Sequence, residues 1–423
     1  MLRPLLGGLI FASALVSIMV RPYRVSEAVS AAAGAALMLA FGFVGIPDAA
    51  GLLVGQWNTF GFFLGLMLIS AVAEEAGVFE VLGYTAARWG RGNAARLYAA
   101  VFAVGTVITV FLSNDATALI LTPVVYALVT RLRLNVLPFV FACTFIADTA
   151  SMVLPVSNPI NILMLHSVGG SLGGFLRYLL LPAAAAVALN AVVFLLLFRR
   201  DLAQDYRLED LPPPRVEDPR YLATVSILLG VIAACYVAAS ITRAPLSVVA
   251  LGGALALLAA ALWRRRLHAR SLARKISWSL FLFVGAMFIL VRGVENLGFT
   301  AEAGRLLATA AGGNALAAVI LVTVGTALGA NLINNVPMAL VMVSTLGALP
   351  ASTPAVSSLP YAAMFGADLG PNLTTVGSLA TMLWLLILRR RGLEVSTLQY
   401  VRLGVTFVPL LLLAGSVLIW LRL

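Results

Sequence analysis

Residues 145–163 read FIADTASMVLPVSNPINIL, a run that is apolar at both ends and interrupted in its middle. The interruption contains Pro155 and Pro159, and a proline inside a helix removes a backbone hydrogen bond and clashes with the preceding turn. The pattern predicts half a helix over residues 136–148, a break, and a second half-helix over residues 160–168. The polar residues around this break are Asp148, Thr149, Ser151, Ser157, Asn158 and Asn161.

The composition of the chain indicates which solvent surrounds this break. Of the 423 residues, 61% are hydrophobic and 11% are charged, whereas soluble domains are about half apolar and a quarter charged. The chain is therefore predicted to be an all-α polytopic membrane protein in a lipid bilayer. Its net charge of +11 indicates no nucleic-acid partner, because the arginines lie in short loops and not in a basic domain. Cys143 and Cys235 lie in apolar segments without metal-like spacing, so neither a metal site nor a disulfide framework is expected.

Several apolar runs are long enough to cross roughly 30 Å of hydrocarbon. The first run is followed directly by Arg21, Arg24 and another apolar run, so we expect a retained span and not a cleaved signal peptide. The regular runs lie near residues 5–20, 27–46, 57–76, 175–198, 221–241, 246–263, 277–295 and 400–421. The less regular regions are residues 97–131, 136–168, 315–347 and 359–388.

A hydrophilic segment, residues 199–220, has mixed charges and three successive prolines, which are typical of a solvated linker. It separates an N-terminal half, residues 1–198, from a C-terminal half, residues 221–423. The halves resemble each other at an offset of 220, since AVGTVITVFLSND (103–115) matches TVGTALGANLINN (323–335) and FIADTASMVLPV (145–156) matches FGADLGPNLTTV (365–376). The same offset brings Glu75 onto Glu295 and Gly65 onto Gly285. One offset that serves four places indicates an internal repeat.

The basic residues predict how the two halves are oriented. The layout places in the cytoplasm Arg21/Arg24, Arg88/Arg91/Arg96, Arg131/Arg133, the linker, residues 264–275, Arg389–Arg391 and Arg402. On it 22 of the 28 Lys and Arg residues are cytoplasmic, as the positive-inside rule requires. This arrangement needs about five spans per half, and therefore about 10 transmembrane helices. Two halves with odd numbers of spans are inverted repeats, as in many secondary transporters. Each half is then predicted to contain a re-entrant hairpin and a broken helix.

Polar clusters occur at corresponding places of the two halves. The second break lies near residues 368–378, and the hairpin tips read SNDAT (113–117) and NLINN (331–335). Irregular backbone at membrane depth is tolerated only where it is buried in protein or lines a cavity. A lone polar residue in a membrane helix often only joins helices, but four repeated clusters favour one cargo site. The predicted substrate-binding residues are Asn114, Thr117, Thr149, Ser151, Ser157, Asn158, Asn334, Asn335, Thr374 and Ser378.

The clusters contain three carboxylates but no basic residue. Asp115, Asp148 and Asp368 are predicted to couple transport to protons or ions, because a carboxylate inside the membrane costs about 2.5–3.5 kcal/mol on the insertion scale. The single lysine, Lys275, is expected in a loop. A site of amides, hydroxyls and carboxylates suits a neutral polyhydroxyl compound or a cation. The chain has no G-x-x-x-x-G-K-[ST] or H-E-x-x-H motif, so neither P-loop ATP hydrolysis nor another enzyme activity is expected.

Four segments carry a family resemblance. FLSNDATALILTPVV, FIADTASMVLPVSNPINIL, NLINNVPMALV and GADLGPNLTTVGSLATMLWL resemble the signature segments of ArsB-type arsenite/antimonite efflux permeases of the ion transporter superfamily. The resemblance covers essentially the whole chain. It implies a secondary active transporter of the bacterial inner membrane that exports As(OH)3 and Sb(OH)3 in exchange for protons, without a cofactor and by an elevator-like cycle. It assigns the substrate site to Asn114, Asp115, Asp148, Ser157, Asn158, Asn334, Asn335 and Asp368.

The resemblance also implies two protein partners. Members of this superfamily are often homodimers, and some relatives bind a soluble ArsA-type ATPase, which the Arg-rich cytoplasmic loops here would accept. Two departures from the family pattern lie near the predicted site. Ala116 and Thr117 stand where relatives often have Gly or Ala, and Asn372 and Thr375 stand where relatives often have Lys and Pro. Without that lysine more negative charge is unpaired near Asp368, which leaves a role for Na⁺ open.

Three other functions stay open on the sequence. The first is a Na⁺/H⁺ antiporter or carboxylate carrier of the same superfamily, which Na⁺-driven flux would indicate. The second is a passive channel or a structural membrane subunit, which accumulation of cargo against a gradient would exclude. The third is an intramembrane enzyme, for which the chain offers no nucleophile, base or metal motif.

Overall fold

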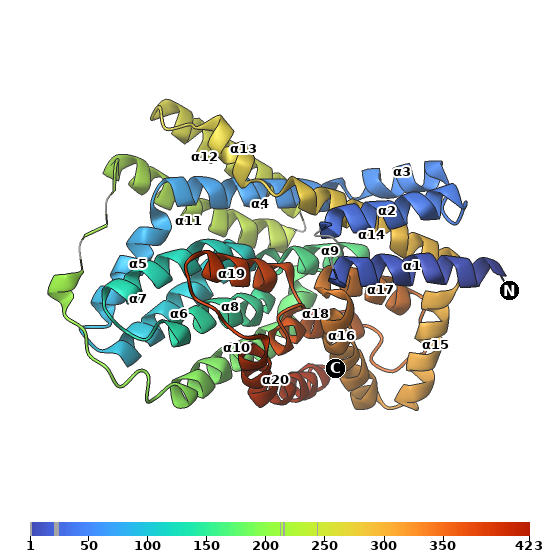
Figure 1. Cartoon of the computed structure of the whole chain (residues 1–423). Helices are drawn as coiled ribbons and strands as arrows, with labels where there is room; N and C mark the ends of the chain where they lie inside the picture. The colour runs from blue at the N-terminus through green and yellow to red at the C-terminus, as the bar shows by residue number, and fades with distance from the viewer. Residues whose placement is uncertain (1, 21–24, 212, 215, 243) are drawn as a thin grey trace.

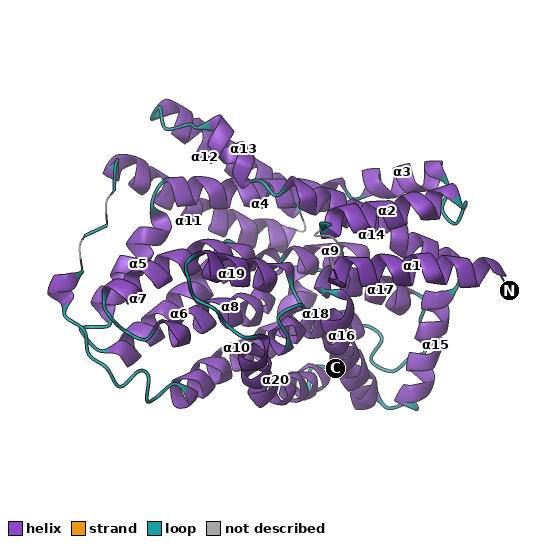
Figure 2. Ribbon diagram, in the orientation of Figure 1, coloured by secondary structure: helices purple, strands orange, loops and turns teal. Residues whose placement is uncertain are grey.

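The computed structural model describes residues 2–20, 25–211, 213–214, 216–242 and 244–423. Arg21 and Arg24, which the sequence analysis used for orientation, lie outside the described residues. The described chain is helical, with its helices joined by loops (Figure 2). Within these ranges nine helices are long and apolar enough to cross a membrane: Arg3–Val20, Trp57–Glu75, Ala94–Phe111, Leu172–Leu197, Pro219–Ala239, Leu246–Trp263, Trp278–Asn296, Ala315–Ile333 and Thr397–Trp420. The chain is thus an all-helical, multi-pass membrane protein.

The helices form two layers, which Figure 1 shows one above the other. In the upper layer, helices from the two halves of the chain pair with each other, because α4 packs along α12 and α2 packs along α14. Gly65 allows the first pair to approach closely, since a Cβ atom at this position would overlap the backbone of Ala250. The upper layer consists of α1 (Leu2–Val20), α2 (Glu27–Ala40), α4 (Trp57–Glu75), α11 (Pro219–Thr242), α12 (Leu246–Trp263) and α14 (Trp278–Asn296).

The lower layer contains the irregular segments. Its main helix pairs are α6 with α8, α16 with α18, and α10 with α20. Stacked aromatic rings fill the space between α8, α10 and α20, with Phe145 centred 4.9 Å from both Phe194 and Tyr400. The helices are α6 (Ala94–Phe111), α7 (Thr122–Arg131), α8 (Val136–Thr149), α9 (Pro159–Ser167), α10 (Leu172–Leu197), α16 (Ala315–Ile333), α17 (Asn335–Gly347), α18 (Leu359–Leu369), α19 (Leu379–Arg390) and α20 (Thr397–Trp420).

Both predicted helix breaks are present in the lower layer. α8 ends at Thr149, two short 3₁₀ turns follow, and α9 begins at Pro159. The side chain of Asn158 caps α9 by accepting a hydrogen bond from the backbone of Ile160. In the second half α18 ends at Leu369, and Ser378 caps α19. The polar residue that ends each break thus satisfies a backbone N–H that the helix itself leaves unpaired.

Two helical hairpins lie where the sequence was irregular. In the first, the hydroxyls of Thr109 and Thr117 are 2.8 Å apart, so the chain after the tip packs back against α6. A π-helical turn, Ala116–Leu121, joins the tip to α7. In the second hairpin, α16 and α17 meet at Asn334, which has a φ of 72°. Asparagine adopts positive φ more readily than most residues, and its side chain also caps α17.

Three sequence predictions differ from the structure. Two amphipathic helices, α5 (Val78–Trp89) and α15 (Phe299–Ala311), were not predicted, because a search for membrane-length apolar runs overlooks one-sided helices. Placing Lys275 in a loop was wrong, since it ends α13 (Ala269–Lys275), a segment rich in helix-forming Ala, Leu and Arg. The run at residues 27–46 is also shorter than predicted, because α2 ends at Ala40 before α3 (Ile46–Gly55) begins.

The close packing of α18 on α16 leads to a stability prediction. A Cβ atom at Gly366 would overlap the backbone carbonyl oxygen of Thr323. We expect Gly366→Leu to destabilise the protein by about 1–3 kcal/mol, because overpacking forces the helices apart. Thermal unfolding of the purified protein in detergent measures the effect. Gly325→Leu on α16 is the matched control, since a Cβ atom there would meet nothing within 4 Å. Equal melting temperatures for the two variants would contradict this packing.

Candidate functional site

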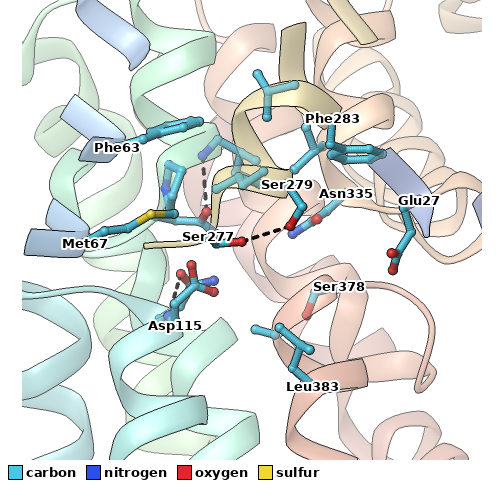
Figure 3. A pocket seen from close by; sticks show the side chains of 18 of the residues that line it. Glu27, Phe63, Met67, Asp115, Ser277, Ser279, Phe283, Asn335, Ser378 and Leu383 are labelled. Carbon is cyan, nitrogen blue, oxygen red and sulfur yellow. Dashed lines mark hydrogen bonds between the residues drawn. The ribbon is translucent and has the colours of Figure 1, made fainter. Parts of the chain in front are cut away.

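A cavity of about 250 Å³ lies between the two layers (Figure 3). Both hairpin tips and both helix breaks contribute to its wall. The lower layer supplies Asn114 and Asp115 from the first tip, Asn335 from the second tip, and Asn158 and Ser378 from the breaks. The upper layer supplies both apolar and hydroxyl side chains, among them Phe63, Met67, Ser277, Ser279 and Phe283.

The Asp368 carboxylate is buried behind this wall and bonded to the other half of the chain. Asn158 Nδ2 donates to Asp368 Oδ1 at 2.6 Å, and Asn161 Nδ2 donates to Asp368 Oδ2 at 2.8 Å. The second amide also donates to the backbone oxygen of Ser151. Each carboxylate oxygen therefore has a donor, and hydrogen bonds to a charged acceptor are about twice as strong as neutral ones.

The Asp148 carboxylate is equally buried, but it is not hydrogen-bonded. Only 1% of Asp148 is exposed, and neither carboxylate oxygen has a hydrogen-bond partner within the described residues. Asn114 and Thr381 are the polar side chains that face it, and Asp115 and Asp368 are within electrostatic range. The two buried aspartates are thus near each other, but only one of them has its hydrogen bonds satisfied.

Helix N-termini add positive potential to the cavity wall. α9 starts after Asn158, α19 after Ser378, and α17 after Asn334, the residue before the wall residue Asn335. A helix N-terminus is equivalent to a partial positive charge that favours electronegative oxygen atoms. The arrangement can therefore hold the oxygens of a small cargo without a fixed cation.

Several predicted site residues lie at the breaks and tips but do not line the cavity. Their side chains make buried or part-buried hydrogen bonds within the lower layer: Thr117 with Thr109, Thr149 with Asn190 and Asn372, Ser151 with the backbone of Asp148, Ser157 with the backbone of Val110, and Thr374 with Asn331. Asn334 is similar, because its amide caps α17 and approaches the backbone of Val376. These positions hold the breaks and tips in place.

The sequence analysis missed the part of the wall that comes from the upper layer. Ser26 and Glu27 reach the cavity from the start of α2, and Ser277 and Ser279 from the start of α14. Each pair follows a basic segment of the chain. A hydroxyl at the start of a span is a common capping residue, so only the packing of the layers distinguishes these from ordinary caps.

A second cavity, of about 270 Å³, shares part of this wall. Asp115 lines both cavities, together with Phe63 and Met67. The second cavity extends to the ends of α4 and α13, where Lys275 Nζ lies 3.0 Å from Glu74 Oε2. The second cavity therefore forms a route from Asp115 to this ion pair, with a wall that is mostly apolar.

The comparisons with known proteins agree with this architecture. The family described as "Arsenical pump membrane protein" (ArsB) matches residues 6–421. The chain is 31% identical over 406 residues to the arsenical pump membrane protein of Escherichia coli K12, and 32% identical over 409 residues to that of Yersinia enterocolitica, with 95% of each chain covered.

A solved structure has the same fold at low sequence identity. The YdaH transporter of Alcanivorax borkumensis superimposes with a TM-score of 0.59 and 16% identity, over 88% of this chain and 86% of that one. The family match covers nearly the whole chain, and the relatives match at similar length. The chain therefore belongs to the ArsB family of arsenical pump membrane proteins, and it is a membrane transporter and not an enzyme.

Proposed function

We propose that this transporter exports arsenite and antimonite, as As(OH)3 and Sb(OH)3, from the bacterial cytoplasm in exchange for protons. The observation that carries the proposal is the cavity of about 250 Å³ at which both tips and both breaks meet. This is smaller than the roughly 300–1,000 Å³ of pockets for drug-sized ligands, and so it suits a small cargo. Arsenite is uncharged near neutral pH, and its hydroxyls match an amide- and hydroxyl-lined wall.

The charge of the cavity wall also favours a neutral cargo over a carboxylate cargo. Among the described residues, the wall of the first cavity contains the Asp115 carboxylate but neither Lys nor Arg. A carboxylate cargo would face like charge from Asp115, with helix N-termini to offset part of the repulsion. A neutral trihydroxide avoids this repulsion, because it can donate hydrogen bonds to a carboxylate.

The proposed function includes two inverted repeats of about five spans each, residues 1–198 and 221–423, joined by the cytoplasmic linker 199–220. The succession of helices supports this division. Trp57 begins α4 and Trp278 begins α14, while Gly77 and Gly298 precede α5 and α15 with φ values of 83° and 82°. In this arrangement α6 and α16 are arms of re-entrant hairpins, although their length alone would allow each to span.

An elevator-like cycle in the inner membrane follows from the two layers. The upper layer would be the scaffold and the lower layer the moving unit, because the cavity lies between them. With residues 264–275 in the cytoplasm, the route from Asp115 to Lys275 makes this an inward-facing state. A homodimer formed through the upper layer would immobilise this scaffold. The Arg-rich cytoplasmic segment near α13 would bind an ArsA-type ATPase.

Transport in everted membrane vesicles tests the proposed function. We expect arsenite to accumulate when a pH gradient is imposed, and a protonophore to abolish the accumulation. Vesicles without the transporter are the control. Arsenite uptake that ignores the proton gradient, or flux that requires Na⁺, would favour the antiporter or carboxylate-carrier alternative.

The hairpin tip of the second half gives a prediction about affinity. Asn335 lines the cavity, so Asn335→Ala should raise the KM for arsenite several-fold, because one hydrogen bond is worth about 0.5–1.5 kcal/mol. Asn334→Ala should instead lower thermal stability, since that side chain caps α17. Ser416→Ala is the control, because its buried hydroxyl bonds only to the backbone of Leu412 on its own helix. An unchanged KM in Asn335→Ala would remove this tip from the cargo site.

A further inference from the structure

The two buried aspartates occupy equivalent positions in the two halves, 220 residues apart in the sequence. Asp368 faces the first residues of α9, where the asparagines at positions 158 and 161 donate to its two oxygens. The equivalent partners of Asp148 are the first residues of α19, at positions 378 and 381. The two environments differ, so the two carboxylates can have different roles in one fold.

At the two equivalent positions there are hydroxyls on the side of Asp148 where there are amides on the side of Asp368, and the Asn114 amide also faces Asp148 from the first tip. Ser378 and Thr381 replace the two asparagines, and their hydroxyl oxygens are hydrogen-bonded to each other at 3.0 Å. Thr381 faces Asp148, and Ser378 lines the cargo cavity. An amide nitrogen has hydrogens that it can only donate, whereas a hydroxyl can reverse its direction and either donate or accept.

We infer that Asp148 carries the exchanged proton, that Ser378 and Thr381 are the positioning residues that connect it to the cargo cavity, and that Asp368 is a structural carboxylate. The inference rests on the proposed arsenite–proton exchange and assigns separate places to the two exchanged species. Cargo occupies the cavity, and the proton binds one layer of side chains behind its wall. Asp148 itself is not part of the wall of either cavity described above.

The hydroxyl pair makes binding of the cargo and binding of the proton unfavourable to each other, although cargo and proton do not touch. When Asp148 is protonated, its O–H donates to Thr381, which donates to Ser378, whose hydroxyl points into the cavity. When a cargo hydroxyl donates to Ser378, the direction reverses, and Thr381 donates to the ionised carboxylate. Either donor in the Ser378–Thr381 bond is compatible with its geometry. Cargo and proton thus stabilise opposite directions of one hydrogen-bond chain.

The other ionisable groups around Asp148 fit this assignment. Asp115 from the first tip and Asp368 from α18 are the charged groups that act on it, and the Tyr400 hydroxyl on α20 faces it. No ion pair in the described part of the chain includes any of these aspartates. A second negative charge near an unpaired carboxylate disfavours ionisation of both. The amide pair favours the ionised form of Asp368, and Asp148 has no such pair, so the proton goes to Asp148.

Two neutral substitutions test the assignment in proteoliposomes that contain the purified protein. Asp148→Asn should reduce arsenite accumulation driven by a pH gradient about tenfold or more, and the arsenite transport that remains should no longer depend on pH. Asp368→Asn should reduce the yield of folded protein but leave the pH dependence of the remaining transport unchanged. Proton-driven accumulation in Asp148→Asn with the pH profile of the unmodified protein would overturn the assignment.

Exchanging the partner residues tests the hydroxyl pair. Ser378→Asn with Thr381→Asn gives Asp148 the amide donors that Asp368 has, which stabilise the ionised form. Half-maximal transport should move by about one pH unit or more toward acid. Thr381→Val removes the connecting hydroxyl and Thr381→Ser restores it. If the double variant does not fold, the two single variants still test the proposal. Slow coupled transport in Thr381→Val, together with a normal rate in Thr381→Ser, supports it. Equal coupled rates in these two single variants contradict it.

Infrared difference spectra at two pH values test Asp148 without any transport. The band of a protonated carboxyl should be lost in Asp148→Asn and kept in Asp368→Asn, and the opposite result would reject the inference. If the unmodified protein shows no arsenite counterflow, the proposed function fails. The spectra would still decide which aspartate takes up a proton.

Discussion

The hydrogen bonds between Asp368 and the amides of Asn158 and Asn161 are the constraint on which the site depends. They join a broken helix of one half to a broken helix of the other at a fully buried position. Burying a carboxylate is costly, and these donors offset that cost at Asp368, so they help to hold the two breaks face to face. Asn158 also caps α9, so the same residue ends the irregular backbone and positions the charge.

The division into layers determines what can move. Glycines allow close backbone contact within each layer, as at Gly65 against Ala250 and Gly366 against Thr323. Between the layers lies the cavity proposed to hold the cargo, whose upper wall is largely apolar near Phe63. Sliding along such a wall breaks few directional bonds, whereas separating α16 from α18 would break a close-packed contact. The proposed elevator movement therefore follows an interface with few directional bonds.

The sequence predicts the breaks and tips well, because Pro159, Asp148 and their neighbours have no place in an uninterrupted apolar helix. It predicts less well which polar side chains reach the cavity. Ser378 lines it and Thr149 does not, although both are hydroxyl residues beside a break. One residue along a helix turns the side chain by about 100°, so membership of the wall depends on local geometry. Ser277 lines the cavity only because the two layers pack together, and the segments that meet there are far apart in the sequence.

A neutral cargo limits the ways in which transport can be coupled to protons. As(OH)3 brings no charge, so it cannot attract or repel a proton through the electric field, as an ionic cargo does. It brings hydrogen-bond donors. An unpaired carboxylate in a poorly hydrated interior is stabilised either by a proton or by oriented donors. A hydroxyl pair that cargo can reverse supplies those donors only when cargo is bound. Such coupling needs rotatable hydroxyls in one half of the repeat and fixed amides in the other. Ser378 and Thr381 carry the hydroxyls, and Asn158 and Asn161 carry the amides.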